Sequence, residues 1–266
     1  MARDERGSSA VATSVATALA VLAVLAVLAA ATVAGVTYRG GGTDGTTADP
    51  VGPGSSTPAG PSTSSAPEPE LAFPDGQRLA GDARDNATVD VPSAEEGWTE
   101  EGLTVGYQTD DGTTVGTEDP YLLDRGFCTA PTGFEEYRAY VGLTAPISDT
   151  SGDDPARDAV DQTLERWLPV VFEGDQEPPE VDYADTEIAD GTPARLATMR
   201  FEALDEDRDR CSPPATELRF LAFDTGDYVA VVVSSRGVTV DGEDLPDGLG
   251  SDLLDEILAS ARVQQP

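Results

Sequence analysis

The 266-residue sequence contains no histidine. A serine or cysteine nucleophile that relies on an imidazole base is therefore excluded within this chain, because that base must take up and return the proton. Zinc sites with histidine ligands are excluded for the same reason. The missing residue type thus removes the commonest hydrolytic and zinc-dependent mechanisms.

Lysine is absent as well, and all 16 basic residues are arginine. Without lysine the chain can form neither a Schiff base nor a Ser-Lys hydrolase pair. The Gly-rich patterns that cradle nucleotide phosphates are also missing, so no cofactor is expected. A pair of carboxylates remains, as in glycosidases. We therefore predict that the protein is not an enzyme, with a carboxylate-dependent hydrolase of envelope glycan as the alternative.

Basic residues are scarce relative to acidic ones, and the net charge is -34. Residues 71–266 hold 13 arginines and 44 acids, so most of this charge belongs to the part expected to fold. Nucleic acids and anionic lipid head groups bind through clusters of Lys and Arg, so neither is an expected partner. A strongly acidic surface is typical of a protein kept soluble in salt, with a specific cationic partner as the alternative.

One long apolar run stands near the N-terminus. Residues 10–38 carry no charge, and about 20 apolar residues are enough to cross a bilayer as a helix. The run predicts a transmembrane signal anchor, with a peptide cleaved near AAATVAG as the alternative. Arg3 and Arg6 precede it, which places residues 1–9 in the cytoplasm and the C-terminal domain outside the cell. The predicted location is the cell membrane, crossed once.

Residues 39–70 are rich in Gly, Ser, Thr and Pro and contain almost no apolar side chains. Such a segment cannot bury enough surface to offset the entropy lost on ordering. We predict a disordered linker that holds the following domain away from the membrane. Residues 71–266, where apolar periodicity begins, are predicted to form one extracellular domain.

Two helices are predicted from capping signals and apolar spacing. Asp154 followed by Pro155 is a typical helix start, and Ser251 is the expected cap of the second helix. Apolar residues follow each start at helical spacing. The first stripe comprises Val160, Leu164, Trp167, Leu168 and Val171, and the second comprises Leu254, Ile257, Leu258 and Ala261.

Strands are predicted on both sides of the first helix. The run YVAVVV is apolar on both alternating faces, which predicts a central strand covered on both sides. The fold class is α+β, an antiparallel sheet with helices on both faces in an α/β/α sandwich, in the order four strands, helix, three or four strands, helix. The predicted strands are 87–93, 102–109, 113–118, 137–146, 194–204, 216–223 and 228–235, with a DTGD hairpin between the last two.

A family resemblance is carried by VDVPSAEEGWTEEG, by GFCTAPTGFEEYRAYVGLT and by the Val-rich strand with its closing helix. The shared features are Val91, Pro92 and Trp98, the two cysteines, and a Ser-x-Arg end at Ser260 and Arg262. On these residues the chain resembles actinobacterial membrane-anchored proteins of unknown function with a Mog1/PsbP-like extracellular domain. The resemblance implies an α/β/α sandwich and an interaction role, and it transfers no catalytic residue.

Calcium is the metal best suited to the acidic loops, because its ligands are oxygens. In YQTDDGTTVGTED, Gly112 and Glu118 have the spacing of the second half of an EF-hand loop. Tyr107 and Thr109, however, stand where carboxylates are required. We therefore predict a hairpin and assign no metal-ligating residue, with weak binding of divalent cations by the ectodomain as an alternative.

The chain has two cysteines, Cys128 and Cys211. A nucleophilic Cys128 would lack a base, and two cysteines alone do not complete a zinc site. An even number of cysteines in an oxidising compartment favours a disulfide, so we predict that Cys128 and Cys211 are bonded. With no catalytic, cofactor-binding or metal residue assigned, the prediction is a membrane-tethered interaction or accessory module of the bacterial cell envelope. Its partner would be an unknown protein or envelope component.

Overall fold

The computed structural model describes residues 69–264 apart from 81–85, 103, 109–111, 113, 132, 146, 149, 151, 173–177 and 203–209. The predicted cytoplasmic segment 1–9, the predicted transmembrane helix 10–38 and the linker as far as residue 68 lie outside the described residues. Within the described ranges, no helix is both long enough and apolar enough to cross a membrane.

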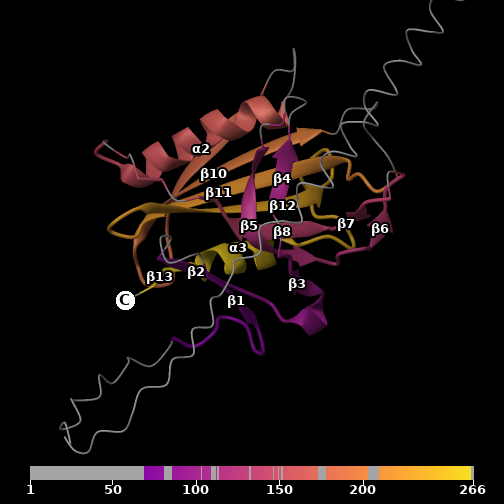
Figure 1. Ribbon diagram of the computed structural model, residues 1–266, viewed down its shortest axis with the longest axis horizontal. Helices are drawn as coiled ribbons and strands as arrows, with labels where there is room; N and C mark the ends of the chain where they lie inside the picture. Colours follow the sequence, from indigo (N-terminus) through magenta and orange to yellow (C-terminus); the bar gives the residue numbers. More distant parts are fainter. Residues whose placement is uncertain are drawn as a thin grey trace, which may run out of the picture. The chain divides into compact units, whose positions relative to one another are not determined.

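An eight-stranded antiparallel sheet lies at the centre of the described domain (Figure 1). Its strands follow the order β3-β5-β8-β12-β11-β10-β9, and β4 pairs with β5 beside this path. The strand bounds are Trp98–Glu100 for β3, Val105–Gln108 for β4, Thr114–Leu123 for β5, Ala139–Leu143 for β8, Val181–Glu187 for β9, Pro193–Glu202 for β10, Ala215–Asp224 for β11 and Val229–Val238 for β12.

Helix α2, Pro155–Val171, covers one face of this sheet. Val160, Leu164 and Trp167 of the predicted apolar stripe are buried there, and the other two stripe residues are partly buried against the same cluster. The ring of Trp167 meets that of Phe220 on β11 edge-on, with 5.4 Å between the ring centroids. The apolar spacing in the sequence thus identified the buried face of α2.

The predicted start of α2 is confirmed. Asp154 accepts a hydrogen bond from the backbone N–H of Arg157 at 3.0 Å and forms an ion pair with Arg195 on β10 at 2.5 Å. The hydrogen bond from Arg157, followed by that from Arg195, lowers the pKa of Asp154. The cap therefore remains charged at neutral pH.

Replacing Asp154 by alanine should lower the free energy of unfolding by about 1 kcal/mol, because the first turn of α2 loses its side-chain acceptor. Asp154→Asn caps equally well and loses only an exposed ion pair, so it should cost roughly 0.5 kcal/mol or less. Urea unfolding of the two variants measures both losses. Equal losses would show that the ion pair with Arg195, and not the cap, stabilises this end.

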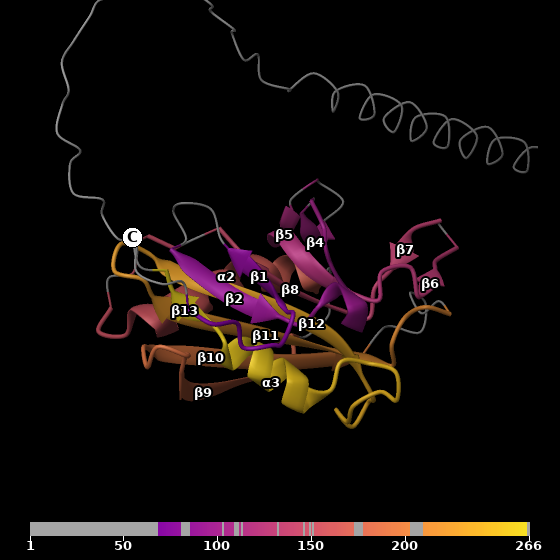
Figure 2. The ribbon, with the colours of Figure 1, turned by 90° about the horizontal axis from the view of Figure 1, so that it is seen from below.

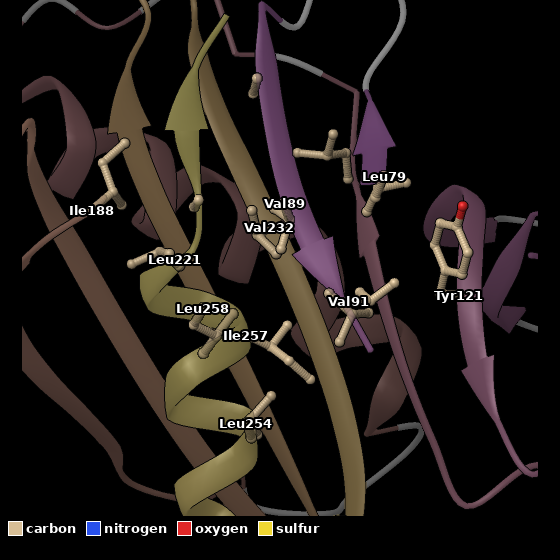
Figure 3. Close-up of a cluster of buried hydrophobic side chains, with 14 of the residues drawn as sticks. Leu79, Val89, Val91, Tyr121, Ile188, Leu221, Val232, Leu254, Ile257 and Leu258 are labelled. Carbon is tan, nitrogen blue, oxygen red and sulfur yellow. The ribbon is translucent and has the colours of Figure 1, made fainter. Parts of the chain in front are cut away.

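The opposite face of the sheet is covered by α3, Ser251–Ala259, and by a three-stranded sheet in the order β1-β2-β13 (Figure 2). The three strands are Gln77–Ala80, Ala87–Val91 and Arg262–Val263. Side chains from α3, β2 and β12 converge in one core, as shown by Leu254, Ile257, Val89 and Val232 in Figure 3. The predicted α+β class, with an antiparallel sheet and two helices, is confirmed.

Strand β12 lies between β8 and β11, and all of its residues are buried. Its side chains alternate between the two cores: Val231 and Val233 pack on the α2 side, whereas Ala230 and Val232 pack on the α3 side. The predictions of a central strand covered on both faces and of a hairpin between β11 and β12 are therefore confirmed.

The capping role predicted for Ser251 is wrong. The N-cap of α3 is Gly250, which has extended backbone angles, and Ser251 is the first helical residue. Asp244 supplies the acceptor from outside the helix, because it receives hydrogen bonds from the Ser251 backbone N–H at 3.0 Å and from the Ser251 hydroxyl at 3.3 Å. A loop residue thus replaces the side chain that local capping rules select.

Strand β2 lies outside the main sheet, and eight strands precede α2 where four were predicted. Asp90 on β2 is buried and forms ion pairs with Arg78 on β1 at 2.7 Å and with Arg262 on β13 at 2.5 Å. These pairs hold the small sheet together. The four additional strands before α2, β1, β3, β6 and β7, have two to four residues each, which is too short to show a clear period in the sequence.

Candidate interaction site

Exposed aromatic side chains gather on a small hairpin, residues 126–137, which we call the finger. Its strands are β6, Cys128–Thr129, and β7, Glu135–Glu136 (Figure 1). Phe127 and Phe134 lie on the finger and are 38% and 59% exposed. Exposed aromatic side chains are enriched where proteins bind other molecules, so the finger is a candidate contact surface.

The predicted disulfide is present and holds the finger in place. Cys128 and Cys211 are joined, with 5.7 Å between their Cα atoms, and the bond connects β6 to the segment that precedes β11. Arg210 adds a second connection by donating a hydrogen bond to the carbonyl oxygen of Thr129 at 2.8 Å. The finger and the segment 210–214 are therefore fixed against each other.

Two hollows lie beside the finger. The larger has a volume of about 640 Å³ and the smaller about 300 Å³, and Arg138 and Gly248 line both. The two hollows therefore adjoin at these residues. Apolar side chains contribute to each wall: Pro92, Trp98, Leu123, Leu249 and Leu253 in the larger hollow, and Phe127, Tyr137, Pro213, Pro214 and Leu245 in the smaller one.

Arg138 follows the finger directly and is oriented by two neighbours. Its guanidinium carbon lies 4.5 Å from the centre of the Phe127 ring, and its Nε lies 3.2 Å from Asp124 Oδ2. The Nε is buried and forms an ion pair with Asp124 but has no hydrogen-bond partner within the described residues. Its terminal nitrogens likewise have no hydrogen-bond partner in the described part of the chain. These N–H groups can donate to a carboxylate or carbonyl oxygen of a ligand.

The charge around the finger differs from that of the whole chain. Three of the 16 arginines, Arg125, Arg138 and Arg210, lie on or beside the finger. Arg125 forms ion pairs with Glu101 and with Glu135. Because Glu101, Asp124, Glu135 and Glu136 lie beside these arginines, the finger carries charges of both signs, whereas acids outnumber arginines 50 to 16 in the chain as a whole.

The loop 239–250, which we call the wall loop, forms part of both hollows and is held by a buried arginine of the central sheet. Arg236 on β12 is buried, with 1% of its side chain exposed. It donates hydrogen bonds to Glu217 on β11 at 2.8 Å and to the carbonyl oxygen of Leu249 at 3.0 Å, and it also pairs with Asp244. The buried arginine thus connects the central sheet to the wall of the larger hollow.

Glu217 is the centre of this charge network. It also accepts hydrogen bonds from Arg200 at 2.6 Å and from Arg219 at 2.9 Å. Burial by itself raises the pKa of Glu217, but the hydrogen bonds from Arg236 and Arg200 and the charge of Arg219 outweigh it, so the pKa is lowered. A carboxylate that holds its charge so firmly is a structural anchor and a poor general acid.

Three carboxylates line the larger hollow: those of Glu96, Asp124 and Asp247. Glu96 accepts hydrogen bonds from the backbone N–H and the hydroxyl of Ser93, at 3.1 and 3.0 Å, and Asp124 pairs with Arg138. Two of these acids are thus engaged in holding the walls. Among the residues that the structure covers, no group of three or more acids or cysteines is placed to hold a metal ion.

The acidic stretch YQTDDGTTVGTED forms a hairpin, as predicted. Gln108 on β4 faces Thr114 on β5, and the two strands pair up to Val105 and Thr117, although the turn residues 109–111 lie outside the described ones. The site that the structure brings together was missed from the sequence. The sequence feature that could have indicated this site is the pair Phe127 and Phe134 near a cysteine, in a segment of turn residues that is followed by Arg138.

A protein-family model matches residues 72–265 and is described as a domain of unknown function, DUF8017. The chain belongs to the DUF8017 family. The finger, both hollows and the wall loop all lie within the DUF8017 match. A comparison with curated proteins finds no match to this chain.

Two solved structures show what the DUF8017 domain is similar to. The Ran-binding protein Mog1p of Saccharomyces cerevisiae is 12% identical, with 71% of this chain and 95% of that chain covered and a TM-score of 0.37. A protein of unknown function from Pseudomonas aeruginosa is 16% identical, with 51% of this chain and 84% of that chain covered and a TM-score of 0.26. Mog1, named by the resemblance in the sequence, is thus present among the structural neighbours at low identity.

Proposed function

We propose that this protein is an extracellular interaction module tethered to a bacterial cell membrane, and that it binds an unknown protein or envelope component at the finger and the two hollows. The observation that carries the proposal is Arg138, which stacks on the exposed Phe127 between the hollows and whose terminal nitrogens have no hydrogen-bond partner among the described residues. Arginine and aromatic side chains supply much of the binding energy in protein interfaces.

The proposed location rests on two features. The uncharged run 10–38 has the length of a membrane-spanning helix, and the charges of Arg3 and Arg6 precede it. The disulfide between Cys128 and Cys211 suits an oxidising compartment outside the cytoplasm. A Mog1/PsbP-like α/β/α sandwich and an origin among anchored actinobacterial proteins belong to the same proposal.

Replacing Arg138 by glutamine should weaken partner binding about thirtyfold, the loss expected when a central interface residue is removed. The full-length chain serves as bait on envelope extracts, and bound proteins and glycans are identified by mass spectrometry. Arg166→Gln is the matched control, because Arg166 is an exposed arginine on α2, away from the hollows. A partner specific to this site is retained by the control and lost by Arg138→Gln and Phe127→Ala.

Two results would overturn this assignment. The first is an identical set of captured molecules for the native chain and for Arg138→Gln, which would place any binding elsewhere on the domain. The second is hydrolysis of envelope glycan by the native chain that Asp247→Asn abolishes, because Asp247 lines the larger hollow and would then act as a catalytic carboxylate.

A further inference from the structure

Strand β9 forms one end of the central sheet and lies at its margin beyond β10 (Figure 2). It pairs with β10 over its whole length, from Val181 opposite Met199 to Glu187 opposite Pro193, without a register shift. Every residue of β9 after Val181 is exposed. No strand of the described part pairs with its outer side, so a row of backbone N–H and C=O groups faces outward there.

β9 lacks most of the features that usually prevent an edge strand from pairing with another chain. Edges are commonly short, bulged, interrupted by proline, covered, or charged. β9 has seven residues, no proline and a regular register, whereas β3, at the other end of the strand order, has three residues. The remaining feature that can prevent pairing with another strand is charge, and the charge on β9 is negative.

The charged residues of β9 itself are all negative, and Arg157 of α2 lies beside them, with its guanidinium carbon 3.5 Å from the centre of the Tyr183 ring. Glu180, Asp182, Asp185 and Glu187 lie on or next to β9, and no arginine occurs between residues 178 and 194. Alternation places Asp182 on one face of the strand and Asp185 and Glu187 on the other. The acids therefore flank the open edge on both faces, and among the described residues only Asp185 of these acids forms an ion pair, with Arg195 on β10.

Helix α2 extends this acidic surface over one face. The hydroxyl of Tyr183 on β9 donates a hydrogen bond to Asp161 of α2 at 2.8 Å, which connects the strand to the helix. Asp158, Asp161 and Glu165 line a hollow of about 410 Å³ on α2. Asp161 already pairs with Arg157 of α2, so an arginine or lysine side chain projecting from a strand beside β9 would meet Asp158 and Glu165 together with the acids of β9.

We propose that β9 is a docking edge for an extended basic segment of a partner protein, which adds to the sheet as a further strand. Backbone hydrogen bonds to the open edge hold the segment, and its Arg or Lys side chains meet the acids on both faces of β9. The sign of the charge selects the partner, because another copy of this chain, with a net charge of -34, is repelled. This surface is independent of the Arg138 site.

The probe is a synthetic peptide in which arginine and threonine alternate, titrated calorimetrically into the full-length chain. We expect saturable binding that weakens as salt is added. A peptide with glutamate in place of arginine should not bind, and an arginine–threonine peptide methylated at every backbone nitrogen should bind at least about tenfold more weakly, because it has no N–H group with which to form a ladder. Absence of binding by the arginine peptide, or equal binding by the N-methylated peptide, would overturn the proposal.

A proline scan of β9 tests the ladder itself, since consecutive backbone N–H groups point to opposite edges of a strand. Two pairs of variants are compared: Asp182→Pro with Ala184→Pro, and Tyr183→Pro with Asp185→Pro. In one of these pairs the prolines remove backbone N–H groups that face outward from the sheet. That pair should weaken peptide binding about tenfold without lowering the melting temperature. The other pair removes donors to β10 and should lower the melting temperature. Strand addition would be contradicted if both variants of the pair that keeps its native stability bound the peptide as tightly as the native chain does.

Discussion

Replacing Glu217 by alanine is expected to lower the free energy of unfolding by about 3 to 5 kcal/mol, the usual cost of breaking a buried ion pair. Glu217 is fully buried and accepts hydrogen bonds from Arg200, Arg219 and Arg236. Without it the buried guanidinium of Arg236 keeps, among the described residues, its two partners in the wall loop, Asp244 and Leu249. Urea unfolding followed by tryptophan fluorescence measures the loss.

Two variants control this experiment. Glu217→Gln keeps the shape and an acceptor oxygen but not the charge, so its loss should be intermediate. Glu202→Ala removes an exposed acid from the neighbouring strand β10 and should change stability by about 0.5 kcal/mol or less. Equal losses for Glu217→Ala and Glu202→Ala would show that the network does not stabilise the fold.

The contribution of Glu217 should also depend on pH. The folded state lowers the pKa of Glu217 below its ordinary value of 4.5, so the folded protein releases this proton more readily than the unfolded chain. The stabilisation is therefore complete above pH 4.5 and is lost as the pH falls through the lower, folded pKa. The stability difference between the native chain and Glu217→Gln should be constant near neutral pH and shrink in acid. A difference that grows on acidification would contradict this sign.

Removing the disulfide is the second change with a large expected effect. The double variant Cys128→Ala, Cys211→Ala should be less stable by about 4 kcal/mol, because the bond closes a loop with a sequence separation of 83 residues. Urea unfolding of the double variant against the native oxidised chain gives the difference. Reduction of the native chain should reproduce it.

The same double variant should bind the proposed partner more weakly than its stability loss explains. The disulfide holds the finger against the segment 210–214, and these two parts form the walls of the smaller hollow. Binding is compared in the absence of urea, under conditions in which circular dichroism shows that the variant is folded. Unchanged stability, or recovery of both thiols free in the native chain by non-reducing peptide mapping, would contradict the structural role of the bond.

Local signals predicted the long elements well. The helix start at Asp154, the apolar stripe of α2, and the central position of β12 follow from side-chain spacing between near neighbours in the chain. Two other predictions failed because the deciding partner comes from a distant part of the chain. Ser251 carries the residue type of a cap, but Asp244 supplies the acceptor for its N–H, and β2 alternates like a strand of the main sheet, yet Asp90 pairs it with β1 and β13.

The candidate site could not be predicted for the same reason. Phe127 and Arg138 lie in one stretch of the chain, Pro213 and Leu249 come from two others, and no local pattern shows that the three stretches meet. The missing bases excluded the common catalytic chemistries, and the negative charge excluded nucleic acid as an expected partner. Those exclusions directed attention to the surface without locating the site on it.

The sequence by itself determined the absence of histidine and lysine, the acidic charge, the amphipathic helices and the two cysteines available for pairing, because these are properties of composition and of local spacing. The tertiary structure alone decided that Arg138 stacks on Phe127 between two hollows, that Glu217 meets three arginines, and that β9 is left at an open edge. The physical reason is that contacts between distant segments depend on how every apolar face is buried at once, which no single stretch of sequence records.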